Sequence, residues 1–127
     1  MARRIPKKPR PSLEFMEAVA RERFVRYAPR KVNQVLSLVR KKNVPNALNL
    51  LKFVPKSCAV LIGKTIKSAA ANAGDPQGKN PKFFVSSAWV GQGPVLKRMR
   101  AHAMGRGATY KRKTCHLTIV VSDSGKR

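Results

Sequence analysis

The spacing of apolar residues changes twice along the chain and predicts the order of its elements. Residues 18–27 alternate imperfectly between apolar and charged side chains, which favours a strand although helix propensity is also high there. Pro29 then suits a first helical turn. Helical spacing of apolar residues follows it, at Val32, Val35, Leu36 and Val39. We therefore expect a strand and then a short amphipathic helix that Asn43 closes.

Two more helices are predicted in the middle of the chain. Residues 46–53 precede Pro55, which ends a helix. The apolar residues expected on one side of this helix are Ala47, Leu50, Leu51 and Val54. Residues 56–73 give the longest helical pattern, and Gly74 is a natural C-cap. The apolar face of this third helix is formed by Ala59, Ile62, Ile66, Ala69 and Ala73.

Strand patterning returns in the last third of the chain. An exposed turn at residues 75–81 leads to an apolar run at 83–90, and residues 115–121 alternate regularly. Between these runs, residues 91–116 read as a long β-hairpin with a Gly-Arg-Gly middle. Arms of roughly ten residues would extend about 30 Å. The predicted fold class is α+β, with about three antiparallel strands packed on three helices and a long hairpin extending from the sheet.

The length of 127 residues suits one domain. We place that domain at residues 15–123, with the hairpin 91–116 included. Residues 1–14 are basic and rich in proline, which predicts an extended segment that either orders on RNA or stays solvated. This segment lacks the apolar stretch of a secretory signal and contains too little serine to favour a transit peptide. Residues 124–127 are expected to be a flexible tail.

The charge balance narrows the class of partner. Lys and Arg number 28 against five acidic residues, giving a net charge of +23, and residues 76–122 contain no acid. A compact chain with this charge repels itself, so a polyanionic partner is expected, and nucleic acid is the first candidate. A membrane surface is the weaker alternative, because no segment is both strongly basic and rich in bulky apolar residues, and no apolar run reaches 18 residues.

The sequence contains few of the residues that catalysis or metal binding requires. Cys58 and Cys115 form no CxxC pair, so a zinc site is disfavoured and both are expected to be small apolar residues in a reducing compartment. Three of the five acids cluster at residues 14–22, and His102 and His116 are far apart in the predicted hairpin. We expect no enzyme activity, no metal and no cofactor.

The hairpin carries the strongest candidate binding residues. On extended strands, Lys97 points away from Arg98, and Arg112 points away from its two lysine neighbours, so charge is expected on both faces of the ribbon. Such a ribbon suits threading between RNA segments, whereas a solvated basic loop is the plain alternative. The candidate RNA-binding residues are Arg30, Lys31, Lys97, Arg98, Arg100, His102, Arg106, Lys111, Arg112, Lys113 and His116.

Three separated motifs resemble the L-twenty-two family of large-subunit ribosomal proteins. They are P-R-K-V at residues 29–32, S-A-A-A-N-A at 68–73, and the stretch from G-P through K-R, G-R-G and K-R-K-T-C-H at 93–116 with the strand after it. The resemblance covers roughly residues 18–123. At the tip the chain departs from the family, with A-H-A-M at 101–104 where relatives often carry Pro-Arg-Ala-Lys.

The resemblance implies a structural constituent of the large ribosomal subunit. Its α+β body would bind large-subunit ribosomal RNA and neighbouring ribosomal proteins, and its hairpin tip would reach the nascent polypeptide at the exit-tunnel wall. The implied setting is a cytoplasmic, ribosome-bound, bacterial-type protein or an organellar one, without membrane contact or homo-oligomerisation. The residues at family-pattern positions are Lys97, Arg98, Arg106, Arg112 and His116.

Two other functions fit parts of the same sequence. A DNA-architectural protein would insert a β-arm into the minor groove, but such arms favour an apolar wedge, and Met104 is the one candidate here. A basic RNA-modifying enzyme would need the acid and base groups that the sequence largely lacks.

Overall fold

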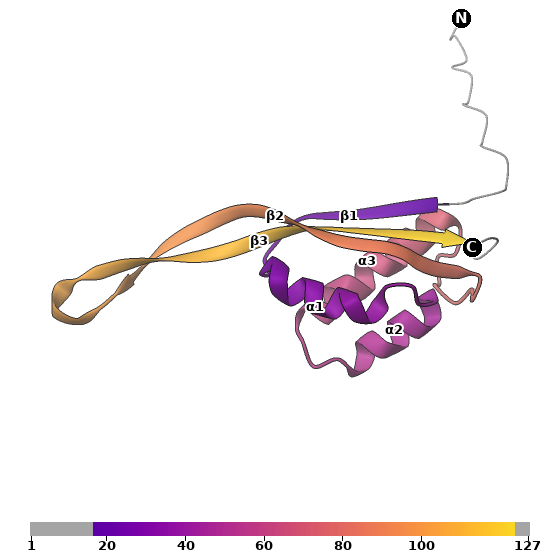
Figure 1. The fold of residues 1–127 in the computed structure, drawn as a ribbon, viewed down its shortest axis with the longest axis horizontal. Coiled ribbons are helices and arrows are strands. Elements are labelled where there is room, and N and C mark those ends of the chain that lie inside the picture. The colour runs from indigo at the N-terminus through magenta and orange to yellow at the C-terminus, as the bar shows by residue number, and fades with distance from the viewer. Residues whose placement is uncertain (1–16, 124–127) are drawn as a thin grey trace, which may run out of the picture.

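The computed structural model describes residues 17–123, and it places three helices on one face of a three-stranded antiparallel sheet (Figure 1). This arrangement confirms the predicted α+β class. The predicted extension 1–14 and tail 124–127 lie outside the described residues. In chain order the elements are β1 (Glu17–Val25), α1 (Pro29–Val39), α2 (Val44–Phe53), α3 (Cys58–Ala73), β2 (Phe83–Ala101), a single 3₁₀ turn (Ala103–Gly105) and β3 (Gly107–Asp123).

The helix boundaries follow local sequence chemistry. Proline occupies the first turn of both α1 and α2, where its missing N–H costs no intrahelical bond. Gly74 ends α3 in the left-handed region, with φ of 105°, and donates its N–H to carbonyls of the last turn. One expectation for α2 was wrong, because Leu50 is exposed. The buried positions of α2 are Val44, Ala47 and Leu51, and Leu50 lies beside that row instead of within it.

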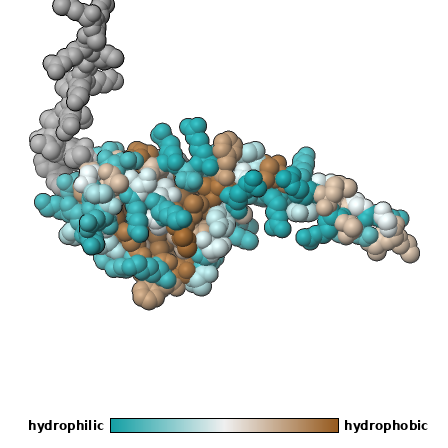
Figure 2. Space-filling model, turned by 180° about the vertical axis from the view of Figure 1, so that it is seen from behind, coloured by the Kyte–Doolittle hydropathy of each residue, from teal (hydrophilic) through white to brown (hydrophobic). Residues whose placement is uncertain are grey.

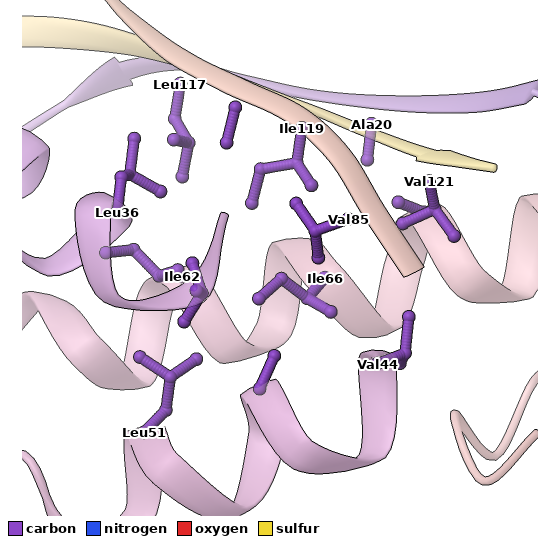
Figure 3. Close-up of a cluster of buried hydrophobic side chains, with 14 of the residues drawn as sticks. Ala20, Leu36, Val44, Leu51, Ile62, Ile66, Val85, Leu117, Ile119 and Val121 are labelled. Carbon is purple, nitrogen blue, oxygen red and sulfur yellow. The ribbon is translucent and has the colours of Figure 1, made fainter. Parts of the chain in front are cut away.

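The central strand β3 carries the inner face of the sheet. Strand order is β1-β3-β2, and the alternating residues Cys115, Leu117, Ile119 and Val121 are fully buried. Figure 3 shows Leu117 and Ile119 pointing from the sheet toward Leu36 of α1 and Ile62 of α3. Because apolar side chains of α1 and α3 meet this one strand face, the alternation along the strand was the most informative pattern in the sequence.

A bulge in β1 explains its imperfect alternation. The register with β3 shifts between Glu22 and Val25, and Phe24 takes a positive φ of 56° within the shift. The extra residue returns Val25 to the core, where it is buried. The bulged Phe24 N–H donates a hydrogen bond of 3.1 Å to Nδ1 of His116, and the two rings meet edge to face with centroids 5.0 Å apart. His116 is therefore part of the β1–β3 junction.

A second bulge separates the body of the protein from the projecting hairpin. The β2 register shifts between Gln92 and Val95, so that β2 has one residue more than β3 at this point. A Cβ atom at position 93 would lie 2.6 Å from Oγ1 of the buried Thr114, which leaves room only for glycine. The Thr114 hydroxyl donates to the carbonyl of Pro94. This contact fastens the bulge to the central strand.

Beyond this bulge the two strands continue as an isolated ribbon, which we call the arm (residues 95–113). Its register pairs run without interruption from Val95–Lys113 to Ala101–Gly107. Every residue from 97 to 109 is exposed. Figure 1 shows the arm extending far from the helices, so it shares none of their packing.

Because the arm contributes little to the core, removing it should leave the body folded. We expect replacement of residues 98–110 by Asn-Gly, a pair that suits a two-residue hairpin turn, to change the free energy of unfolding by less than about 1 kcal/mol. Urea denaturation followed by circular dichroism measures this. Loss of a cooperative transition would mean that the arm supports the core.

The two histidines should differ in their effect on stability. His116→Ala removes the acceptor for the Phe24 N–H and an edge-to-face ring contact, and it should lower the free energy of unfolding by about 1 kcal/mol. His102→Ala, at the exposed tip, is the matched control and should stay within about 0.5 kcal/mol of the parent protein. Equal losses in the two variants would contradict a structural role for His116.

Candidate nucleic-acid interface

The register of the arm sorts its charges by chemical type. Residues directly opposite each other in an antiparallel pair share a face. One face, which we call the lysine face, carries Lys97 opposite Lys111, with Lys113 next to them. The arginine face carries Arg98, Arg100 and Arg112, together with Tyr110. The expectation of charge on both faces is confirmed, and each face proves to carry one kind of cation.

The lysine face contains a pair that destabilises the free ribbon. Lys97 and Lys111 lie directly opposite each other, and like charges in that position repel. No acidic residue occurs between positions 76 and 122 to offset them. Both side chains are exposed, so water and salt ions screen the repulsion in the isolated protein. A polyanion along this face would convert the repulsion into attraction.

The arginine face is organised around an aromatic ring. The guanidinium carbon of Arg100 lies 5.0 Å from the centroid of the Tyr110 ring, and that of Arg112 lies 5.3 Å from it. Both distances are within the range of cation–π attraction. Tyr110 is also the one side chain at positions 107–113 that is not classed as exposed. Two arginines are thus held against one ring before any partner binds.

Where the arm meets the body, a basic hollow of 750 Å³ forms, which we call the notch. The body contributes Arg26, Tyr27 and Lys31, while the arm contributes Tyr110 and several cations. The notch contains no acid, so its potential is uniformly positive. The residues that line it are Arg26, Tyr27, Ala28, Lys31, Ser57, Leu96, Arg98, Tyr110, Lys111, Arg112, Lys113 and Thr114.

A neighbouring hollow of 660 Å³ surrounds the start of α1 and shares Lys31 and Lys113 with the notch. Arg30 and Lys56 also line it. Lys56 donates a 2.7 Å hydrogen bond to Gln34, which holds its ammonium group beside the helix. The positive end of the α1 dipole adds to these charges. The body and the root of the arm therefore form one continuous basic surface.

The sequence-predicted residues fall into three groups in the structure. Lys31, Arg98, Lys111, Arg112 and Lys113 converge in the notch, with Arg30 in the hollow next to it. Lys97 pairs with Lys111 beside the notch but does not line it, Arg100 lies farther along the arm, and His102 and Arg106 lie at its tip. His116 is half-buried in the sheet and bonded to Phe24, away from the notch.

The tip differs in character from the rest of the arm. The His102 N–H donates to the Arg106 carbonyl at 2.7 Å and closes a turn in which Met104 has a φ of 59°. Met104 is 97% exposed. Figure 2 shows hydrophilic side chains near the body and a paler, partly apolar end. The basic surface therefore fades before the arm ends.

Sequence reasoning missed three charged or aromatic residues of the notch, which are Arg26, Tyr27 and Tyr110. Tyr110 precedes the Lys-Arg-Lys run directly, and an aromatic residue among basic ones is a signal of nucleic-acid binding that could have identified it. Arg26 and Tyr27 carried no such signal, because only the folded chain brings the end of β1 against the arm.

Metal-binding side chains do not cluster in the part of the chain that the structure describes. Between residues 17 and 123 no group of three or more His, Cys, Asp or Glu could hold a metal ion. Cys58 and Cys115 are buried, as expected, and burial together with the nearby Cys58 raises the pKa of the Cys115 thiol. No helix in this part of the chain is long and apolar enough to cross a membrane.

Comparisons with known proteins agree with the family resemblance. Residues 20–122 match the family described as ribosomal protein L22p/L17e. A protein of Endomicrobium trichonymphae named large ribosomal subunit protein uL22 is 54% identical over 109 residues, covering 86% of this chain and 94% of that protein. The proteins of the same name from Desulforamulus reducens and Clostridium acetobutylicum are 46% and 44% identical, with 85% of this chain covered in each case. The chain therefore belongs to the L22p/L17e family of ribosomal proteins.

Proposed function

We propose that this protein is a structural constituent of the large ribosomal subunit that binds and organises large-subunit ribosomal RNA. The observation that carries the proposal is the acid-free arm with cations on both faces, in a chain of this ribosomal family. A ribbon with a repelling lysine pair and no core of its own gains its stability from a polyanion on both sides. Folded RNA supplies such an environment. Water around a solvated loop does not.

The notch and the arm divide the work of binding. In the notch, cations from the segment just after β1, from α1 and from the arm converge on one hollow, so a single bend of RNA backbone can contact all of them. Along the arm, the lysine and arginine faces meet RNA on opposite sides. Such contacts fix the position and orientation of the protein, while the shape of the folded RNA selects the site.

We further propose that the tip reaches the wall of the nascent-peptide exit tunnel. Its exposed Met104 and small neighbours suit contact with a passing polypeptide better than contact with phosphates. His102 and Arg106 remain there as RNA contacts. In this proposal residues 15–123 act as one domain and one copy, beside neighbouring ribosomal proteins, on a bacterial-type ribosome in the cytoplasm or in an organelle.

Co-sedimentation tests the assignment directly. The protein should travel with large subunits through a sucrose gradient at physiological salt and should stay with them as a single copy. A protein that remains free of large subunits would refute the proposal. A protein that dimerises and bends duplex DNA would instead support a minor-groove protein with Met104 as its wedge.

The salt dependence of RNA binding tests the interface. Replacing Arg98, Arg112 and Lys113 with alanine should reduce the slope of log affinity against log salt by up to about three contacts' worth, roughly 0.7–0.9 each. Binding of a large-subunit ribosomal RNA transcript at several salt concentrations measures this.

The control variant replaces Lys79 and Lys82, which lie around the start of β2, at the end of the sheet opposite the arm. Its slope should change less for each charge removed. Equal changes per charge in the two variants would mean that the notch has no special role.

A further inference from the structure

We propose that Arg100, Tyr110 and Arg112 form a stacking site for unpaired nucleobases on the arginine face of the arm. The proposal rests on the RNA-binding function proposed above and deepens it. It states that the two faces of the arm bind different parts of RNA, with bases on the arginine face and phosphates on the lysine face.

The strand register places the Tyr110 ring between the two arginines. Arg112 follows Tyr110 by two residues on β3, on the side nearer the body. Arg100 lies on β2 opposite Ala108, on the side nearer the tip. The guanidinium carbons lie 5.0 Å and 5.3 Å from the ring centroid. Three planar groups therefore follow one another along a single face of the ribbon.

The chemistry of the three groups supplies the second step. A guanidinium is planar and weakly hydrated, and it stacks on flat π systems, whereas an ammonium is a compact and strongly hydrated point charge. Nucleobases in single-stranded RNA stack on aromatic rings and on arginine planes. A row of Arg, Tyr and Arg offers such planes already ordered against one another, so less side-chain freedom is lost on binding.

The opposite face supplies an internal contrast. There Lys97, Lys111 and Lys113 are accompanied by Met99 and Thr109, and Thr109 Oγ1 lies 3.6 Å from the Met99 sulfur. No aromatic ring lies on that face of the arm. Its lysines can neutralise phosphates but offer no plane for a base. Segregation of the two cation types by face thus predicts two different ligand chemistries.

Unpaired bases fit the site better than paired ones. In A-form RNA the base edges of the major groove are out of reach of side chains, and the base faces are covered by their neighbours in the stack. The exposed groups of the arginine face can meet a base plane only where RNA opens, at a loop, a bulge or an end. The site is therefore expected to select irregular RNA.

Two RNA probes of equal charge separate base stacking from phosphate binding. The first is a 12-nucleotide oligoadenylate, and the second is the same oligomer with its central six nucleotides abasic. The full-length protein should bind the first about ten-fold more tightly, a ratio within the range of one or more base–aromatic stacks. The two probes should give the same salt slope, because their phosphate number is the same.

The variants keep the charge of the arm but remove the planar guanidinium groups or the aromatic ring. Tyr110→Leu combined with R100K and R112K should bring the preference for base-bearing RNA to about two-fold or less, with the salt slope unchanged. Tyr110→Phe keeps the ring and should retain the preference. The control K79R/K82R exchanges cations at the end of the sheet opposite the arm and should also retain it. Amide NMR spectra of the arm check that its register survives in each variant.

The outcomes distinguish this proposal from the broader one. Equal binding of both probes by the parent protein would overturn the stacking site. A preference that persists in the Tyr110→Leu, R100K, R112K variant would also overturn it. None of these results affects co-sedimentation with large subunits, on which the broader function depends.

Discussion

The main constraint on this structure is the mutual repulsion of cations held on a two-stranded ribbon. In the body, each strand has apolar contacts with the helices, so charges can remain at the rim. In the arm there is no such support, and Lys97 faces Lys111 across the ladder. Backbone hydrogen bonds, the cation–π contacts of Tyr110 and the bulge at the root hold the ribbon in its extended form. The proposal that the arm binds RNA follows from placing a polyanion against that charge.

The body and the arm are held in their folded conformations by different interactions. The body is ordered by burial: Leu36, Ile62, Ile66 and the inner residues of β3 have essentially no exposed surface. The arm is ordered by strand pairing, by the cation–π contacts of Tyr110 and by the bulge at its root, with no buried core of its own. Such a protein can complete its core before it meets RNA and keep its binding surface adaptable until then. Separation of these steps suits a component that is built into a large particle.

Sequence patterns predicted the elements well and the irregular positions poorly. The alternation from Cys115 to Val121 and the helical spacing in α1 and α3 are direct consequences of burial, so they could be read from one chain. The bulges could not, because a single extra residue leaves the local composition unchanged. The Phe24 bulge hid the end of β1, and the pairing register was needed to show that lysines and arginines occupy separate faces. The notch could not be predicted either, because it joins the residues just after β1 and the start of α1 to arm residues about 80 positions away.

The bulge at Gly93, Pro94 and Thr114 gives the arm the mechanics of a lever. Seven register pairs lie beyond it, from Val95–Lys113 to Ala101–Gly107, which corresponds to a length of about 20 Å. A rotation of about 10° at the root would displace the tip by roughly 3.5 Å, about the rise of one residue along a strand. The hydroxyl of Thr114 and the absence of a side chain at Gly93 thus fix the angle between the arm and the body. A small change in this angle becomes a larger displacement at the tip. One buried threonine and one glycine, far from the tip, determine the aim of the arm.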